Sequence, residues 1–219
     1  TTPAACVKAA RDYVQSEQRG LKQITGDAIR KIEVGKVALA QKCAAQFNAT
    51  TIAEADLAQL IALYGEADQP AQAKAALDRA LASKTLPVNV RADVLSQAVL
   101  TGLRELKSPE RNARLERYVD ELDRLKGDFL EAQLSAHARM NGFYRGDDID
   151  DGIIKHSTWL IERAKTFTPQ QRTQYGSTIV SAHINMAEAV AGGGGDPPPR
   201  HTLCGAGGHR GGPTETGLL

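Results

Sequence analysis

The sequence has 219 residues, enough for one domain with a sizeable core or for a short array of helical repeats. Its hydrophobic fraction of 42% and charged fraction of 24% are ordinary for a globular protein, while aromatic residues make up only 5%. Lys and Arg number 27 against 26 Asp and Glu, with the two signs interspersed, which argues against nucleic acid as a partner. No run of 18 apolar residues occurs, which argues against a membrane-spanning helix.

Signals for helix starts are frequent along the chain. Three places hold a capping hydroxyl followed by a proline suited to the first helical position: Thr2-Pro3, Ser108-Pro109 and Thr168-Pro169. Thr51 with Glu54, and Thr168 with Gln171, have the spacing of capping boxes. Between such starts apolar residues recur at helical spacing, whereas the alternation typical of strands is absent. The sequence therefore predicts an all-α protein.

We expect nine helices, at residues 3–19, 26–48, 51–64, 70–83, 88–106, 109–126, 128–145, 149–166 and 169–191. On the second of these, Ile32, Leu39, Cys43 and Phe47 form the predicted apolar stripe. The loops are short, so consecutive helices should be antiparallel neighbours. Nine helices in hairpins favour a superhelical α-solenoid over a single bundle.

Residues 57–80 resemble a tetratricopeptide (TPR) helix pair, whose repeat is about 34 residues long. The residues at the corresponding spacings are Leu57, Leu60, Tyr64, Ala73, Leu77 and Ala80. The small alanines allow two helices to approach closely, and the larger side chains fill the gap between repeats. Residues 185–195 are similar to the first helix and turn of a further repeat. This resemblance implies a TPR-like stack of antiparallel helical hairpins.

The composition changes abruptly at the end of the chain. Residues 192–219 hold ten Gly and four Pro, so half of this tail consists of helix-breaking residues. We expect a helical-repeat domain at 1–191 and a disordered tail at 192–219, either a genuine flexible tail or the product of a shifted reading frame or an early gene end. Without a further helix to cover 169–191, apolar side chains around Ile184, Met186 and Val190 should be exposed.

Three stretches together resemble the helical region that precedes the thioredoxin domain in TlpA-like exported bacterial proteins. They are Ser108–Arg114, Met140–Ile161 and Ala182–Ala189. The resemblance implies an exported, periplasmic protein whose redox chemistry belongs to a Cys-x-x-Cys motif on a thioredoxin fold. This sequence has no such motif, so the catalytic domain would be absent from this chain. The alternative is a cytoplasmic location.

Cys6 and Cys43 are the most informative cysteines. Cys6 opens the first predicted helix and Cys43 lies near the end of the second, so antiparallel packing brings them together. In an exported protein they could form a disulfide. The alternative is two unconnected small hydrophobic residues, because free cysteine is commonly buried.

No arrangement of residues in the sequence predicts a catalytic, metal or cofactor site. The acidic cluster before Gly152 resembles a calcium loop, but Ile149 and Thr158 occupy ligand positions. His137, His156 and His183 lack partners at metal-binding spacing, so we interpret them as interface histidines. The tail residues His201, Cys204 and His209 make only three zinc ligands, with nothing to orient them.

Tyr144 and Trp159 are the candidate residues for a peptide-binding surface, since aromatic anchors concentrate binding energy. The alternative is that they fill the space between helices. Two functions remain open from the sequence. One is a noncatalytic helical-repeat module for binding a protein or peptide partner, or for spacing. The other is the N-terminal helical part of a TlpA-like thiol–disulfide oxidoreductase.

Overall fold

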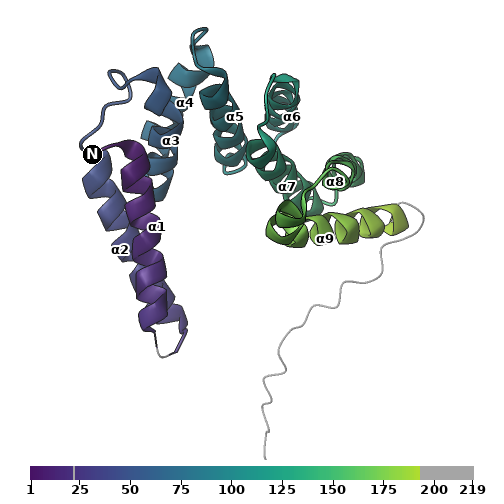
Figure 1. Cartoon of the computed structure of the whole chain (residues 1–219), viewed down its shortest axis with the longest axis horizontal. Helices are drawn as coiled ribbons and strands as arrows, with labels where there is room; N and C mark the ends of the chain where they lie inside the picture. The colour runs from purple at the N-terminus through teal and green to yellow at the C-terminus, as the bar shows by residue number, and fades with distance from the viewer. Residues whose placement is uncertain (22, 193–219) are drawn as a thin grey trace, which may run out of the picture.

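The computed structural model of the chain describes residues 1–21 and 23–192. Within this part of the chain every regular element is helical, which confirms the all-α prediction. Figure 1 shows the helices following one another in a row from the α1–α2 hairpin to α9. Their bounds are α1 Pro3–Gly20, α2 Gly26–Ala44, α3 Leu57–Glu66, α4 Pro70–Ala82, α5 Val88–Gly102, α6 Pro109–Arg124, α7 Leu130–Gly146, α8 Asp150–Ala164 and α9 Pro169–Gly192.

The predicted helix caps are present at three starts. The hydroxyl of Thr2 accepts from the Ala5 amide at 3.2 Å, and that of Ser108 accepts from the Arg111 amide at 3.1 Å. At the start of α9 the capping box is reciprocal, because the Gln171 amide donates to Thr168 Oγ1 at 3.2 Å while the Thr168 amide donates to the Gln171 side chain at 2.9 Å. These bonds satisfy amides that a helix start leaves without partners.

The capping box expected at Thr51 and Glu54 is wrong. A 3₁₀ turn, η1 (Glu54–Asp56), precedes α3, and no side chain caps it. The Glu54 carboxylate instead accepts from the hydroxyls of Ser83 at 2.8 Å and Thr85 at 3.0 Å, both beyond the end of α4. The carboxylate that the local pattern assigned to the cap thus makes long-range hydrogen bonds instead. The helix α3 begins at Leu57 rather than at residue 51.

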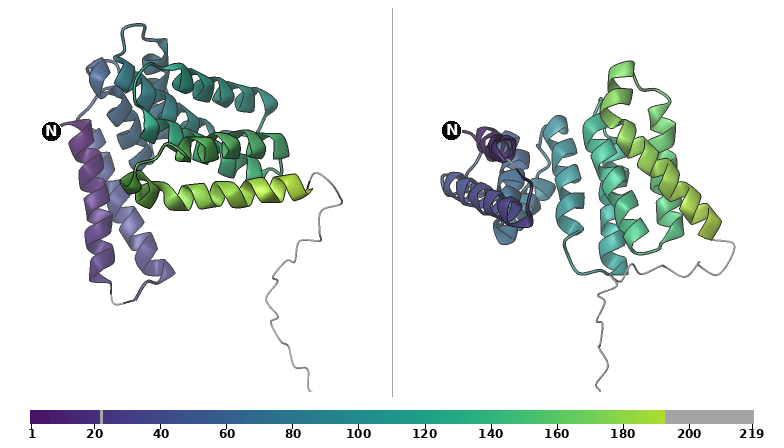
Figure 2. Two further views of the ribbon diagram at one scale, coloured as in Figure 1. Left: turned by 45° about the vertical axis from the view of Figure 1, so that its right-hand side comes forward. Right: turned by 90° about the horizontal axis from the view of Figure 1, so that it is seen from below.

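The helices pack as a serial array. Each helix from α1 to α8 contacts the next in sequence, and the odd-numbered helices also contact one another in order, α1 with α3, α3 with α5, α5 with α7 and α7 with α9. The odd helices therefore form one continuous layer along which the others are hairpin partners. The views in Figure 2 place the α1–α2 hairpin at one end and α7, α8 and α9 at the other. This arrangement agrees with the predicted stack of antiparallel hairpins.

The core follows the same repetition, in three successive clusters. The first joins α1 to α5 around Leu60 and Leu77, the second joins α5 to α9 around Leu115 and Met140, and the third joins α7 to α9 around Leu160. Burying each such leucine stabilises the fold by roughly 1.5–3 kcal/mol. No single cluster spans the molecule, as expected of a protein whose hairpins bury their faces against their neighbours.

Two of the hairpin turns have the same geometry. Asp68, after α3, and Asp148, after α7, adopt left-handed backbone conformations with φ of 52° and 55°. The amide after Asp68 donates to the carbonyl of Tyr64 at 2.9 Å, and the amide after Asp148 donates to the carbonyl of Tyr144 at 3.0 Å. This long backbone bond is the mark of a Schellman helix end. The hairpins α3–α4 and α7–α8 therefore have the same type of turn between their helices.

Parts of two predicted apolar stripes lie on the surface. Leu39 on α2 is 38% exposed, and buried alanines, Ala40 and Ala44, take the place expected for it, because they continue the face that begins at Ile32. On α9, Ile184 and Val190 are 50% and 62% exposed.

The face of α9 that packs inward is narrow. It consists of Ala182, Asn185 and Ala189, and Met186 is half-buried beside it. The expected exposed stripe is thus present in part, whereas the expectation for the tail concerns residues outside those that the structure describes. Within the described residues, none of the helices is long and apolar enough to cross a membrane.

Candidate functional site

A cavity of about 920 Å³ runs along the array and is lined by residues of α1 to α7. Its lining combines charged side chains with apolar ones such as Ile61, Leu77 and Leu81, which we call its apolar floor. A cavity of this size, with an apolar floor and convergent polar groups, is large enough to hold several residues of an extended peptide.

Most of the charged side chains that line this cavity are ion-paired with one another. The pairs are Lys36–Glu33 at 2.6 Å, Lys36–Glu66 at 3.1 Å, Arg11–Glu66 at 3.6 Å, Lys74–Asp78 at 2.6 Å and Arg114–Glu105 at 2.5 Å. Burial opposes the charge of Lys36, but its bonds to Glu33 and Glu66 outweigh burial and raise its pKa. These pairs leave little net charge at the α1–α4 end.

Arg104 and Arg139 differ from those neighbours. Both line the cavity, Arg104 just after α5 and Arg139 on α7, and neither is ion-paired to any residue that the structure describes. Arg139 donates only from Nε, to Ser135 Oγ at 3.0 Å. Burial and, next, the charge of Arg104 lower the pKa of Arg139. The cavity therefore holds two guanidinium groups close enough to repel each other, without a counter-ion.

A second polar site lies inside the array, where α6, α7 and α8 meet. His137 of α7 and His156 of α8 are 1% and 0% exposed, and their Nδ1 atoms lie 3.0 Å apart. The Nε2 atom of His137 lies 3.1 Å from Asp123 Oδ2, and that of His156 lies 3.0 Å from Glu116 Oε1. Both carboxylates belong to α6. The four side chains form one chain of hydrogen bonds, from Asp123 through both imidazoles to Glu116, which we call the histidine relay.

Glu116 is held as a carboxylate by three donors. Besides His156, the Tyr144 hydroxyl donates to Oε1 at 2.7 Å, and Lys155 Nζ donates to Oε2. Burial of Glu116 opposes its ionisation, but these bonds outweigh burial and lower its pKa to about 2. Burial, and next its bond to Glu116, raise the pKa of Tyr144. Burial also lowers the pKa of His137, against the opposing bond to Asp123.

Buried amides continue the polar contacts from α7 to α9. Asn141 donates to Ser157 Oγ at 2.6 Å and to the Ile153 carbonyl at 3.2 Å, both on α8. The side-chain amide of Asn185 on α9 donates to Asn141 Oδ1. Ser157 lies at helical spacing between Ile153 and Leu160, on the apolar face of α8. A polar residue on such a stripe is the one sequence signal that could have indicated this network.

The candidate anchors Tyr144 and Trp159 lie at the histidine relay. Tyr144 is buried, at 6% exposure, and Trp159 is half-buried, with its ring stacked on His137 at a centroid separation of 3.8 Å. These positions match the alternative interpretation, in which the two aromatics fill space between helices. The cavity that could receive a partner lies elsewhere, along α1 to α7, and Arg104 and Arg139 were not among the residues that the sequence singled out.

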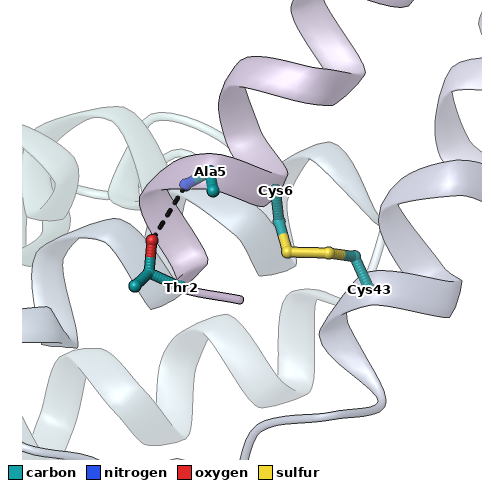
Figure 3. Close-up of a disulfide and its surroundings, with 4 residues drawn as sticks. All are labelled: Thr2, Ala5, Cys6 and Cys43. Atoms are coloured by element: carbon teal, nitrogen blue, oxygen red, sulfur yellow. Dashed lines mark hydrogen bonds between the residues drawn. A yellow bond between two sulfur atoms is a disulfide. The ribbon is translucent and has the colours of Figure 1, made fainter.

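The structure joins Cys6 and Cys43 in a disulfide, with Cα atoms 6.0 Å apart. Figure 3 shows the bond linking the first turn of α1 to the end of α2, beside the cap that Thr2 makes to Ala5. The separation lies within the usual range for disulfides, about 4.4–6.8 Å. Antiparallel packing of the two helices is what brings these ends together.

The described residues contain no group of three or more His, Cys, Asp or Glu side chains placed to hold a metal ion. His137 and His156 are interface histidines with polar partners, whereas His183 is exposed on α9. The three tail residues considered for zinc lie outside the described residues.

The described residues form an all-helical serial array with a cavity lined by charged and apolar side chains. Comparison with protein-family models, with curated proteins and with solved structures gives no match. The resemblances to tetratricopeptide arrays and to TlpA-like proteins therefore rest on the residues alone.

Proposed function

We propose that this chain is a noncatalytic helical-repeat module that binds an extended, acidic segment of a partner protein in the cavity along α1 to α7. The observation that carries this proposal is the pair of guanidinium groups, Arg104 and Arg139, which line the cavity without a counter-ion. An arginine fork binds a carboxylate through two parallel bonds, so an acidic side chain or a chain terminus matches the pair.

The rest of the cavity supports the same kind of ligand. Its apolar floor around Ile61 and Leu77 can hold the side chains that flank a carboxylate, while the ion pairs at the α1–α4 end leave the surplus positive charge near Arg104. The helices that form it are fixed by their own cores, so little ordering is needed on binding. A preformed groove on a serial array is how helical-repeat proteins commonly bind partners.

The experiment is a titration of the full chain against fluorescent peptides, one acidic and one with each Asp or Glu replaced by Lys. We expect the acidic peptide to bind more tightly and to lose affinity with added salt. The double variant Arg104→Ser/Arg139→Ser should weaken that binding by roughly 10- to 100-fold, since hydrogen bonds to charged groups contribute about 1.5–3 kcal/mol.

Arg124→Ser is the matched control. Arg124 is the last residue of α6 and does not line the cavity. It lies about 15 Å along the helix from Arg114, which does line the cavity. The control should bind like the unaltered chain. Equal affinity for the acidic and basic peptides, or an equal loss in the control, would remove the proposal.

A second candidate function is the helical part of an exported TlpA-like oxidoreductase whose thioredoxin domain is not in this chain. The disulfide between Cys6 and Cys43 favours it, because disulfides persist mainly in exported proteins. Sequencing the gene downstream in all three frames tests it. A thioredoxin-like segment with Cys-x-x-Cys supports this function, and a continued run of helical repeats contradicts it.

A further inference from the structure

The histidine relay fixes the positions of its protons. A carboxylate can only accept hydrogen bonds, so the Nε2 atom of His137, which faces Asp123, must carry a hydrogen. The Nε2 atom of His156 faces Glu116 and must carry one as well. Since the pKa of Glu116 is about 2, its side chain is a carboxylate at neutral pH.

The contact between the two Nδ1 atoms then needs one further proton. A neutral imidazole has a single N–H, and in both rings that hydrogen is on Nε2. Two bare Nδ1 atoms would face each other at 3.0 Å with their lone pairs opposed. Two added protons would instead point two N–H groups at each other and bury two adjacent positive charges. Only one added proton allows all three hydrogen bonds of the relay.

We propose that His137 and His156 bind one shared proton as an Nδ1–H···Nδ1 bridge, and that a second proton, arriving in mild acid, opens the junction of α6, α7 and α8. The bridge joins α7 to α8, and the two carboxylates join each of these helices to α6. A second proton breaks the bridge while both imidazoles stay enclosed. The three helices must then separate to admit water.

The surrounding charges hold the first proton and resist the second. Those that face the pair are Glu116 and Asp123 from α6, Lys155 from α8 with Asp120 beside it, and the Tyr144 hydroxyl from α7. The two carboxylates favour one positive charge between them. Lys155 and burial oppose a second, and burial lowers the pKa of His137 accordingly.

The other helices packed on α7 bring their charges to different places. Asp93 of α5 has its pKa raised by burial and by the charge of Glu131 at the start of α7, and Glu188 of α9 pairs with Arg145 at the end of α7, 3.0 Å away. The pH response of the junction therefore belongs to the pair and its five neighbours.

A metal ion fits less well than a proton between the two Nδ1 atoms. Zinc lies 2.0–2.1 Å from each nitrogen and takes four ligands. The described residues offer the two Nδ1 atoms, and no group of three His, Cys, Asp or Glu side chains there could complete the set. A nitrogen–nitrogen distance of 3.0 Å is the ordinary length of a hydrogen bond.

The experiment follows the imidazole nitrogens of the full chain, labelled with ¹⁵N-histidine, by long-range ¹H–¹⁵N spectra from pH 8 to 4. At pH 7 we expect protons on both Nε2 atoms and one slowly exchanging Nδ1 proton shared by the two rings. An absent Nδ1 proton at pH 7 would overturn the proposal.

Variants and metal addition separate the remaining explanations. His137→Gln and His156→Gln should each remove the shared signal, whereas His183→Gln, at an exposed histidine, should leave it unchanged. Because a variant in the core could fail to fold, the titration of the unaltered chain is the primary measurement. Loss of the shared signal on chelation, or its replacement by a stoichiometric complex on adding Zn²⁺ alone, would show a metal site and contradict the shared proton.

Hydrogen exchange tests the opening of the junction. After correction for intrinsic rates, amides of α7 and α8 should lose protection between pH 7 and pH 5, while those of α3 and α4, which lie outside the junction, should keep theirs. An equal change in both pairs of helices would show general acid loosening and contradict a local device.

Discussion

Gly152 of α8 lies against the ring of Tyr144 of α7, and a Cβ atom added at Gly152 would come within 2.4 Å of that ring. Tyr144 is buried and donates to Glu116, so the ring has little freedom to move aside. The absence of a side chain at Gly152 therefore sets the distance between α7 and α8 at the histidine relay.

We predict that Gly152→Ala destabilises the protein by about 1–3 kcal/mol, the usual cost of overpacking a core. Gly142→Ala is the control, because Gly142 is also helical but has nothing within 4 Å of an added Cβ. It should stabilise the protein by roughly 0.5–1 kcal/mol through helix propensity. Urea unfolding measures both, and similar shifts in the two variants would contradict the close contact.

The turn after α3 offers a test at a single residue. Asp68 has φ of 52°, a conformation that suits glycine. We predict that Asp68→Gly raises the free energy of unfolding by up to about 1 kcal/mol. Asp68→Val should lower it, because a β-branched residue is strained there. Thermal unfolding of the two variants gives the comparison, and shifts of the same sign would show that backbone strain does not govern this site.

The helices and their hairpin order could be predicted because their signals are local. The hydroxyls of Thr2, Ser108 and Thr168 each act within one turn of the helix that they cap. Where a distant residue competes, as Ser83 does for Glu54, the local pattern gave the wrong start. Local rules hold only when tertiary contacts leave the side chain free.

The histidine relay could not be predicted, because its members are far apart in the sequence. Glu116 and His156 are 40 residues apart, and His137 and His156 are 19 apart. Each histidine alone looks like an ordinary residue on an amphipathic helix. The array places α6, α7 and α8 side by side. Only that placement creates the contacts that determine how many protons the two imidazoles carry. The same holds for Arg104, just after α5, and Arg139 of α7, because α5 and α7 are in contact but are not consecutive in sequence.

Glu116 should give a pH dependence at low pH. Its pKa is lowered from 4.5 to about 2, so it contributes stability that is fully present above pH 4.5 and lost as the pH falls through about 2. We predict that Glu116→Gln lowers the free energy of unfolding at pH 7 by up to about 3 kcal/mol. The difference from the unaltered chain should already shrink where mild acid opens the junction of α6, α7 and α8, and what remains should shrink further between pH 4.5 and 2. Denaturant unfolding across this range measures it, and a constant difference would contradict the assigned ionisation.

The disulfide closes a loop of 37 residues between Cys6 and Cys43. On the loop-entropy model a bridge of this span stabilises the fold by about 4 kcal/mol. We therefore predict that Cys6→Ser/Cys43→Ser, or reduction of the unaltered chain, lowers the free energy of unfolding by up to that amount. The loss should centre on α1 and α2, because the first turn of α1 is fixed to the end of α2 through this bond (Figure 3). Cys204→Ser is the control and should leave the free energy of unfolding unchanged.

Thiol counting under denaturing conditions should find one free cysteine of the three in the unaltered chain. Three free thiols in protein made in an oxidising compartment would show that the bond does not form, and would also remove the support that it lends to export.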